Sequence, residues 1–163
     1  MKTIQLTQGK ETVVDDADFD YLNQHKWFCV YIGYAPKYPY AFRKVNGKAI
    51  TMHRFLLAPE KGFVIDHVNG DGLDNRRSNL RVCTQRQNTY NRRPNRSSRS
   101  GIKGVSFSTA NPSKPWVAVI GKPRRYLGSF RTKEEAGQTY AAAALEMYDQ
   151  YAYAARNLDK SAA

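Results

Sequence analysis

Hydrophobic and polar residues alternate in short runs over the first 53 positions, a pattern typical of half-buried β-strands. Strands are predicted at 3–7, 11–14, 27–33, 40–44 and 48–53. The sequence Gln8-Gly9-Lys10 supplies a turn after the first strand, and Asn46-Gly47 is typical of a tight hairpin. The acidic stretch 15–18 predicts the start of a short helix that ends near Asn23. The N-terminal region is therefore expected to be rich in β-structure.

The middle of the chain predicts a strand, a polar loop, a second strand and a helix. These elements are expected at 63–65, 67–79, 80–83 and from 84 onward. The first strand delivers Asp66 and His67 at its end. Thr84 and Gln87 have the spacing of a capping box, in which each side chain caps the other residue's backbone N–H group. The helix should therefore carry Asn88 on its first turn.

A linker and a second module are predicted beyond this unit. Residues 89–100 are dominated by Asn, Arg, Ser and Pro, a composition typical of a linker. Strands follow at 102–108, 116–121 and 124–130. Thr132 and Glu135 form a second capping box, which predicts the start of a long helix. Its apolar positions share one face, which is expected to be core; they are Ala136, Tyr140, Ala143, Ala144, Met147 and Tyr151.

The distribution of charge indicates a polyanionic partner. The chain has 163 residues and a formal net charge of +12, and residues 75–133 hold 15 basic side chains and no acidic one. Nucleic acid is the partner that such a stretch favours, because each neutralised phosphate releases counterions. The alternative is a basic surface like that of a ribosomal protein, or one that serves solubility alone.

Composition excludes several other classes of protein. A hydrophobic content of 41% excludes a wholly disordered basic tail. No run of 18 apolar residues predicts a membrane span, and the N-terminus lacks an apolar secretory signal. Cys29 and Cys83 belong to no C-x-x-C pair, which argues against a structural zinc knuckle. A cytoplasmic protein without disulfides is expected.

The residues of the central unit suggest phosphodiester hydrolysis. Adjacent residues on a strand point to opposite sides, so Asp66 and His67 could flank a bound phosphate. A neutral imidazole suits a general base near pH 7, and Asp66 and Asn88 carry oxygen ligands suited to Mg²⁺ or Mn²⁺. The alternative is a structural Asp-His pair in a turn. An EF-hand calcium loop is set aside, because Val68 and Leu73 occupy positions that should bind the ion.

The segment 66–81, together with Asn88, resembles the HNH endonucleases of the phage homing type. The resemblance covers roughly residues 1–92 and implies a ββα-metal fold that cuts DNA with one divalent ion, Mg²⁺ or Mn²⁺. It implies that His67 is the general base, that Asp66 and Asn88 bind the metal, and that Asn79 fixes the loop through backbone hydrogen bonds. Met52-His53-Arg54 also resembles the segment that precedes the site in this group, and His53 is interpreted as structural.

Residues 99–158 resemble the plant APETALA and ethylene-response-factor DNA-binding domain. The matching landmarks are 102–105, 116–120, 126–130, 134–136 and 157–158. That family lays a three-stranded sheet in the major groove, which implies groove-facing roles for Lys103, Arg124 and Tyr126. Uncharged residues replace the usual charged ones at Ser106, Ser108, Val119 and Gly121. Anchoring through the DNA backbone is therefore expected rather than base-specific reading.

The sequence thus predicts an α+β protein with three parts. Residues 1–92 form a β-rich region with a ββα-metal HNH site (core about 50–92), 93–99 a basic linker, and 100–163 a DNA-binding sheet packed on one helix. The predicted function is a strand-nicking, metal-dependent endonuclease acting as a monomer on double-stranded DNA. The alternatives are a non-catalytic DNA-binding regulator on an HNH scaffold and an RNA-binding accessory protein. The predicted DNA contacts are Arg76, Arg77, Arg86, Arg92, Arg93, Lys103, Arg124 and Tyr126.

Overall fold

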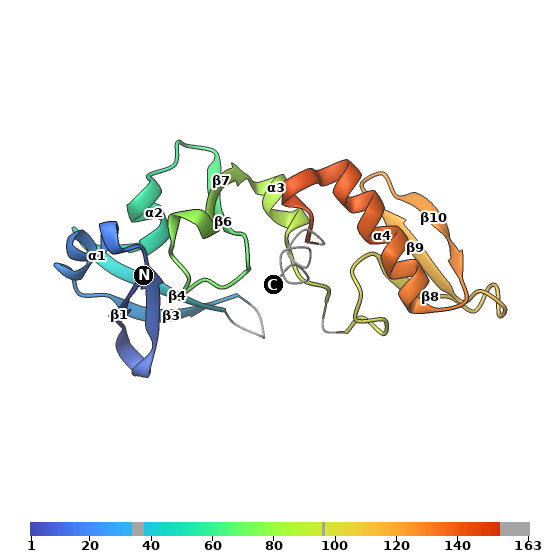
Figure 1. Ribbon diagram of the computed structural model, residues 1–163, viewed down its shortest axis with the longest axis horizontal. Helices are drawn as coiled ribbons and strands as arrows, with labels where there is room; N and C mark the ends of the chain where they lie inside the picture. The colour runs from blue at the N-terminus through green and yellow to red at the C-terminus, as the bar shows by residue number, and fades with distance from the viewer. Residues whose placement is uncertain (34–37, 96, 154–163) are drawn as a thin grey trace. The chain divides into compact units, whose positions relative to one another are not determined.

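The chain forms two compact units, an N-terminal unit of residues 1–88 and a C-terminal unit of residues 89–163. The computed structural model describes residues 1–33, 38–95 and 97–153 (Figure 1). The predicted boundary, after residue 92, therefore lies four residues beyond the observed division. Within the described residues, no helix has the length and apolar character needed to cross a bilayer.

The N-terminal unit contains small antiparallel sheets joined by short helices (Figure 1). Its elements are β1 (Lys2–Gln5), β2 (Glu11–Val14), α1 (Asp16–Asn23), β3 (Phe28–Ile32), β4 (Tyr38–Val45), β5 (Lys48–Thr51), α2 (Met52–Leu57), β6 (Phe63–His67) and β7 (Leu80–Thr84). Strands β1 and β2 pair, β3, β4 and β5 form a meander, and β6 pairs with β7. Helix α3 (Gln85–Tyr90) begins in this unit.

The predicted strand at 48–53 is wrong in its last two positions. Strand β5 ends at Thr51, and helix α2 begins at Met52. The apolar residues Met52, Phe55 and Leu56 are spaced at i, i+3 and i+4, so a helix places them on one face. Met52 is completely buried, and the other two pack against the same core. Tertiary packing of this face therefore overrides the local β-like alternation.

The core of the N-terminal unit lies among its first two sheets and helices α1 and α2. Its buried hydrophobic residues are Ile4, Leu6, Val14, Leu22, Trp27, Cys29, Ala41 and Met52. The indole Nε1 atom of Trp27 donates a 2.8 Å hydrogen bond to the Leu22 carbonyl oxygen, which satisfies its buried polar group. This core gives a rigid support for the β6–β7 hairpin that follows in the chain.

Strand β2 also binds the polar segment, residues 67–79. The Val13 N–H group donates to the Leu73 carbonyl oxygen at 2.9 Å, and the Asn75 N–H group donates to the Val13 carbonyl oxygen at 2.8 Å. These bonds form a parallel bridge between Val13 and Asp74. On another side, Gly72 lies so close to Tyr40 that a Cβ would come within 2.6 Å of its ring. The first 50 residues, whose role the sequence left open, therefore support this loop.

The C-terminal unit packs a three-stranded antiparallel sheet on one long helix (Figure 1). Its elements are β8 (Val105–Phe107), β9 (Trp116–Ile120), β10 (Arg125–Phe130) and α4 (Lys133–Tyr148), with β9 in the middle of the sheet. Thr132 accepts a hydrogen bond from the Glu135 N–H group at the start of α4, as the capping sequence predicts. Its core residues are Val105, Ala118, Ile120, Ala136, Tyr140, Ala144 and Ala152.

The predicted apolar face of the long helix is correct for its central residues and wrong for one. Ala136, Tyr140 and Ala144 are buried against the sheet. Met147, however, is 44% exposed. It lies in the last turn of α4, whereas the strongest contacts of the helix are with β9 and β10. Helical periodicity shows which face is apolar but not where along its length the sheet ends.

Close packing at Gly104 generates a stability prediction. Its φ is +73°, and a Cβ there would lie 2.0 Å from the Tyr140 ring. Gly104→Ala is expected to lower the free energy of unfolding of the C-terminal unit by about 2 to 4 kcal/mol, through backbone strain and overpacking. Gly101→Ala is the control, because its φ is +67° with open space around the Cβ, and about 1 kcal/mol is expected. Equal losses in thermal unfolding of the two variants would refute the packing argument.

Candidate active site

The β6–β7 hairpin positions the two central residues of the predicted site. Asp66 and His67 end strand β6, where they pair in register with Arg81 and Leu80 of β7. Each of the two is only 5% exposed. The chain turns immediately afterwards, where the Gly70 N–H group donates to the His67 carbonyl oxygen at 2.8 Å. The hairpin therefore buries a carboxylate and an imidazole at adjacent positions of one strand.

The carboxylate of Asp66 forms an ion pair with the residue opposite it. The Nη2 and Nε atoms of Arg81 lie 2.6 and 3.0 Å from Asp66 Oδ2. Both side chains are largely buried, so solvent screens this pair little. Arg81 is not among the site residues predicted from the sequence. The antiparallel register of β6 and β7 is the feature that indicates its role, because this register places residue 81 opposite residue 66.

The imidazole of His67 is surrounded by other rings. Its centroid lies 5.0 Å from that of His53 and 5.8 Å from that of Tyr40, both edge to face. His53 Nε2 in turn lies 3.0 Å from the hydroxyl oxygen of Thr51. His53, interpreted from the sequence as structural, therefore directly contacts the predicted base. Tyr40 carried no sequence signal, because it reaches the site from a distant strand.

Burial determines the charge of both imidazoles. It lowers the pKa of His67, while a hydrogen bond with Asn75 and the nearby Asp66 carboxylate act in the opposite direction. Burial, together with the neighbouring His67, lowers the pKa of His53 to about 3. Both rings are therefore neutral near pH 7, and a neutral imidazole can accept a proton.

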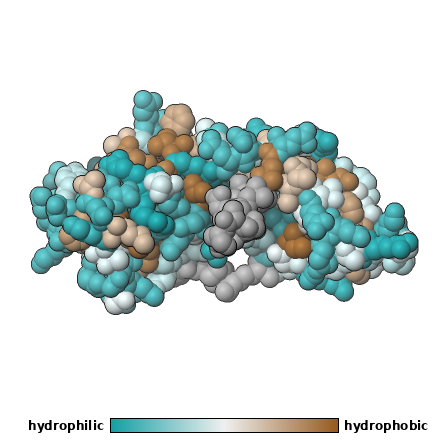
Figure 2. Space-filling view, in the orientation of Figure 1, coloured by the Kyte–Doolittle hydropathy of each residue, from teal (hydrophilic) through white to brown (hydrophobic). Residues whose placement is uncertain are grey.

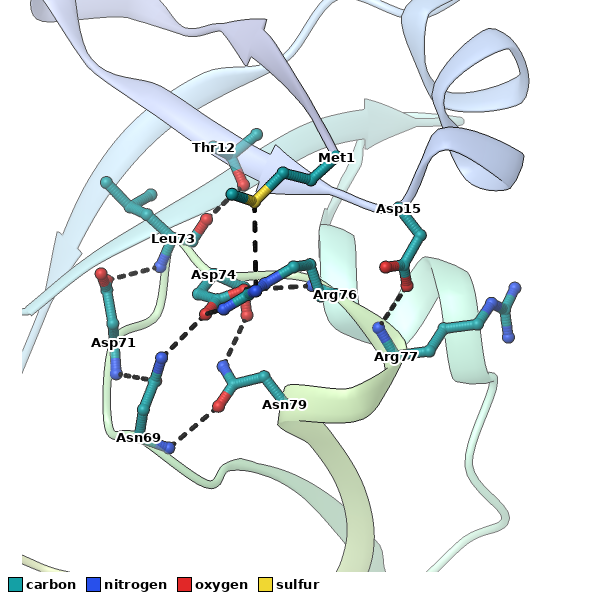
Figure 3. Close-up of polar contacts among 10 residues, drawn as sticks. All are labelled: Met1, Thr12, Asp15, Asn69, Asp71, Leu73, Asp74, Arg76, Arg77 and Asn79. Carbon is teal, nitrogen blue, oxygen red and sulfur yellow. Dashed lines mark hydrogen bonds and ion pairs between the residues drawn. The ribbon is translucent and has the colours of Figure 1, made fainter. Parts of the chain in front are cut away.

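Side-chain amides hold the polar segment in shape (Figure 3). Asn79 Oδ1 accepts from the Asn69 N–H group at 2.9 Å, and Asn79 Nδ2 donates to the Asp74 carbonyl oxygen at 2.8 Å. The Asn79 carbonyl oxygen also accepts from the Val68 N–H group at 2.9 Å. Asn79, the last residue of the polar segment, thus bonds to backbone groups near the start of the segment and in its middle.

Asp74 joins the loop to a predicted DNA contact. Arg76 donates to its two carboxylate oxygens from Nε and Nη2 at 2.8 and 2.6 Å, and Asn69 Nδ2 donates to Oδ2 at 2.8 Å (Figure 3). The Arg76 guanidinium lowers the pKa of Asp74. Similarly, Arg77 donates to both carboxylate oxygens of Asp18 at 2.8 Å. Both predicted DNA-binding arginines therefore bind carboxylates of their own unit.

Helix α3 carries the second predicted metal ligand. The Thr84 N–H group donates to Gln87 Oε1 at 2.8 Å, and the Gln87 N–H group donates to Thr84 Oγ1 at 3.2 Å, which confirms the predicted capping box. Asn88 lies on this helix half-buried, and Arg86 is exposed. Among the described residues, no group of three or more His, Cys, Asp or Glu side chains is placed to hold a metal ion. A divalent ion here would therefore depend on amide, water or phosphate oxygens as further ligands.

The structure gives Lys103 a different contact from the predicted one. Its Nζ atom donates to the carbonyl oxygens of Thr89, Tyr90 and Arg92 at 3.2, 2.7 and 2.8 Å. These carbonyls include the free end of helix α3, where a cation is favourable. The ammonium therefore caps its own unit, and the prediction that Lys103 faces a DNA groove does not fit this contact.

The other predicted contacts of the C-terminal unit are accessible. Arg92 is exposed, and Arg93 and Arg124 line an open cavity of about 400 Å³ with Val119. Tyr126 is 62% exposed, and its hydroxyl lies 2.8 Å from Ser129 Oγ. Hydrophilic residues predominate on the face shown in Figure 2. Arg92, Arg93, Arg124 and Tyr126 therefore remain predicted DNA contacts.

Comparisons with known proteins connect this site to one family. Residues 58–90, which contain β6, the polar segment, β7 and α3, match the family described as HNH endonuclease. The protein "Uncharacterized HNH endonuclease L560" of Acanthamoeba polyphaga mimivirus is 28% identical over 137 residues, covering 80% of this chain and 67% of that protein. "Protein 3.8" of Escherichia phage T7 is 40% identical over 48 residues, covering 29% of this chain and 40% of that protein. No solved structure matches. The family match and the named relative support a DNA endonuclease.

The Asp74 contacts generate a prediction about acid stability. The pKa of Asp74 is lowered in the folded chain, so its stabilisation is complete above its ordinary pKa of 3.8 and is lost as the pH falls through the lower folded value. Asp74→Asn is expected to cost about 1 to 3 kcal/mol at pH 7, and less at pH 2. Urea unfolding at both pH values measures this, with the exposed Asp20→Asn as control. The same pH dependence in both variants would contradict the assignment.

Proposed function

Starting from an HNH endonuclease domain at residues 58–90, we propose that the chain hydrolyses phosphodiester bonds in double-stranded DNA with the help of one divalent metal ion. The main support for the proposal is that a carboxylate, Asp66, and an imidazole, His67, occupy adjacent positions at the buried end of β6. This end of the strand leads into a polar segment held by side-chain hydrogen bonds.

His67 is proposed to be the general base. Its neutral ring can accept the proton of the attacking water, which then becomes a stronger nucleophile toward phosphorus. Ring contacts from His53 and Tyr40 restrict the orientation of the imidazole, so the accepting nitrogen keeps a constant direction. Asn79 supports this arrangement indirectly, because it holds the loop that continues from His67.

Asp66 and Asn88 are proposed to bind the metal ion, Mg²⁺ or Mn²⁺. The donor chemistry fits, because carboxylate and amide oxygens are ligands that these hard cations prefer. When bound, the ion would act as a Lewis acid that stabilises negative charge on the leaving 3′ oxygen. Arg81 restricts the orientation of the Asp66 carboxylate through the ion pair.

The C-terminal unit is proposed to anchor the enzyme on DNA in the manner of an APETALA-like domain. Helix α4 covers one face of its sheet, and Arg124 and Tyr126 are exposed near the edge strand β10. Arg92 and Arg93, which follow the end of α3, add exposed positive charge to this unit, and Arg86, near the start of α3, is exposed on the N-terminal unit. Contacts of this kind with phosphates supply affinity with little dependence on base sequence.

We further propose that the activity is of the homing type and that it nicks one strand. One His67-centred site generates one nucleophile, so a monomer should cut one strand in each visit. A double-strand break would then need two copies of the chain or two successive cuts. Simultaneous double-strand breaks at limiting concentrations of a monomeric enzyme would contradict this part.

His67→Ala tests the chemistry. Supercoiled plasmid and phage genomic DNA are incubated with the full chain and Mg²⁺, Mn²⁺ or EDTA, and the conversion to open circles or nicked strands is measured. The wild type should nick only with metal, and His67→Ala should be at least about a hundredfold slower, because it lacks the general base. His25→Ala is the matched control, because His25 lies outside the polar segment and contacts Tyr21 and Phe55 instead.

The outcomes also separate the alternative functions. If His67→Ala nicked as fast as the wild type, His67 would not be the base. If neither protein cut any DNA yet both bound duplex DNA tightly, the non-catalytic regulator would be favoured. Preferential binding of RNA over duplex DNA at matched salt would instead support the RNA-binding accessory protein.

Salt dependence tests the basic surface. The double variant Arg92→Ala/Arg93→Ala should reduce the slope of log binding constant against log salt concentration by about two, if each guanidinium neutralises one phosphate. Binding is measured with EDTA present, so that cleavage does not interfere. Lys44→Ala/Lys48→Ala is the control, because it removes the same charge from exposed positions near the β4–β5 hairpin. An unchanged slope in the arginine variant would remove these residues from the interface.

A further inference from the structure

The sheet of β3, β4 and β5 has two faces, and only one of them contributes to the core of the N-terminal unit. Neighbours along a strand point to opposite faces, whereas residues directly paired across two strands share a face. Cys29 and Ala41 pair with each other and are buried in the core. Tyr40 precedes Ala41 on β4, and Tyr38 lies two positions before Tyr40, so both tyrosines belong to the other face.

Tyr40 connects this second face to the candidate active site. Its ring centroid lies 5.8 Å from those of both His53 and His67. Gly72 of the polar segment also approaches it, because a Cβ at Gly72 would lie 2.6 Å from the Tyr40 ring. Strand β4 is therefore fixed to the site at Tyr40, and the same face of the strand continues beyond it to Tyr38.

Tyr38 and Ile32 form an exposed apolar pair at that next position. They are directly opposite each other on β4 and β3, and they are 38% and 44% exposed. Two residues of an antiparallel strand span about 7 Å, so the pair lies about this far from Tyr40 along the strand. One DNA strand rises by about 3.4 Å per nucleotide. The pair can therefore contact nucleotides within a few steps of a phosphate at His67.

The chemistry of the pair suits the bases of DNA rather than its phosphates. An aromatic ring and a branched aliphatic side chain carry no charge for a phosphate, and a tyrosine ring stacks on a base of any sequence. Residues 21–59, which include this whole sheet, contain no Asp or Glu that would repel a polyanion. Proteins that bend DNA insert apolar side chains between neighbouring bases, which are then partly unstacked.

Burial of the candidate active site gives a second reason for such a contact. Asp66 and His67 are each only 5% exposed, so a phosphate must leave the regular outline of the duplex to approach them. Bending the backbone of stacked DNA costs free energy, and an inserted side chain supplies compensating contacts. An apolar pair close to the site is well placed for this role.

We propose that Tyr38 and Ile32 form a wedge that inserts at a base step of duplex DNA beside the scissile phosphate. Tyr38 stacks on the base that is uncovered, and Ile32 fills the space next to it. The inference rests on the proposed function and deepens it, because it gives the N-terminal unit a contact with bases. The C-terminal unit then supplies phosphate contacts, and the wedge brings one step of the duplex to His67.

The first test detects the base contact without rapid cutting. The full chain carrying His67→Ala is mixed with Mg²⁺ and phage genomic fragments in which 5-iodouracil replaces thymine. The mixture is irradiated, and crosslinked peptides are mapped by mass spectrometry. Tyr38 should carry several times more adduct than Tyr31, which is equally exposed at 38% and pairs with Pro39 on the opposite face. Equal adducts on both tyrosines, or none on Tyr38 in a chain that binds the DNA, would overturn the proposal.

The second test measures nicking by the full chain. Tyr38→Ala should reduce kcat/KM about ten- to a hundredfold, which is the usual cost of removing a ring stacked on a base. Tyr38→Phe keeps the ring and should stay within about threefold of the wild type. Tyr31→Ala is the matched control and should nick like the wild type. Equal kcat/KM values for the wild type and Tyr38→Ala, with both folded by thermal unfolding, would contradict the wedge.

A second copy of the chain is another occupant that an exposed apolar pair can take. Sedimentation of the wild type and Tyr38→Ala without DNA distinguishes it from the wedge. The proposal expects the same sedimentation for both proteins. A wild-type dimer that Tyr38→Ala dissociates would show that the pair is a contact between copies, and it would overturn the proposal.

The outcomes separate the wedge from the proposed function. If the wild type nicked no DNA but Tyr38 carried the adduct, the endonuclease would be refuted and the base contact would stand. If the wild type nicked DNA and Tyr38→Ala nicked it equally well, the wedge alone would be refuted. A wild type that neither bound nor nicked duplex DNA would refute both.

Discussion

The buried polar loop imposes the main constraint on this structure. The polar segment places Asp74, Asn75 and Asn79 out of solvent, and each would destabilise the fold by about 1 to 3 kcal/mol if it lost its partners. The chain meets this constraint with reciprocal bonds among amides, carboxylates and backbone groups (Figure 3). Such a network allows few alternative arrangements, since moving one member leaves several buried groups unsatisfied. A rigid loop beside His67 is the result.

The elements whose signals are local were predictable from the sequence. The capping residues Thr84 and Thr132 mark the starts of α3 and α4, and the strand ending in Asp66 and His67 lies where its apolar run indicates. The prediction failed at residues 52–53, where alternation favoured a strand but burial of Met52 favours a helix. Local patterns are reliable only where the tertiary contacts favour the same structure.

The parts of the candidate site that sequence analysis missed depend on pairings between distant residues. Arg81 faces Asp66 only because of strand register, and Thr12 reaches Asn75 across 63 positions of the chain. Likewise, the family resemblance implied a DNA contact for Lys103, whereas its ammonium donates to three backbone carbonyl oxygens. In each case residue type indicated a chemistry, and only the fold could select the partner.

The two units differ in how far their positive charges are paired with carboxylates. In the N-terminal unit, Arg76, Arg77 and Arg81 bind the carboxylates of Asp74, Asp18 and Asp66, so the polar segment carries little uncompensated positive charge. In the described part of the C-terminal unit, Lys133 pairs with Glu134, and the basic side chains of this unit far outnumber its acidic ones. In the proposed function, attraction for a phosphate backbone therefore comes mainly from the C-terminal unit, because uncompensated charge is what releases counterions. The N-terminal unit can then keep its charges in a network whose geometry serves the chemistry rather than the affinity.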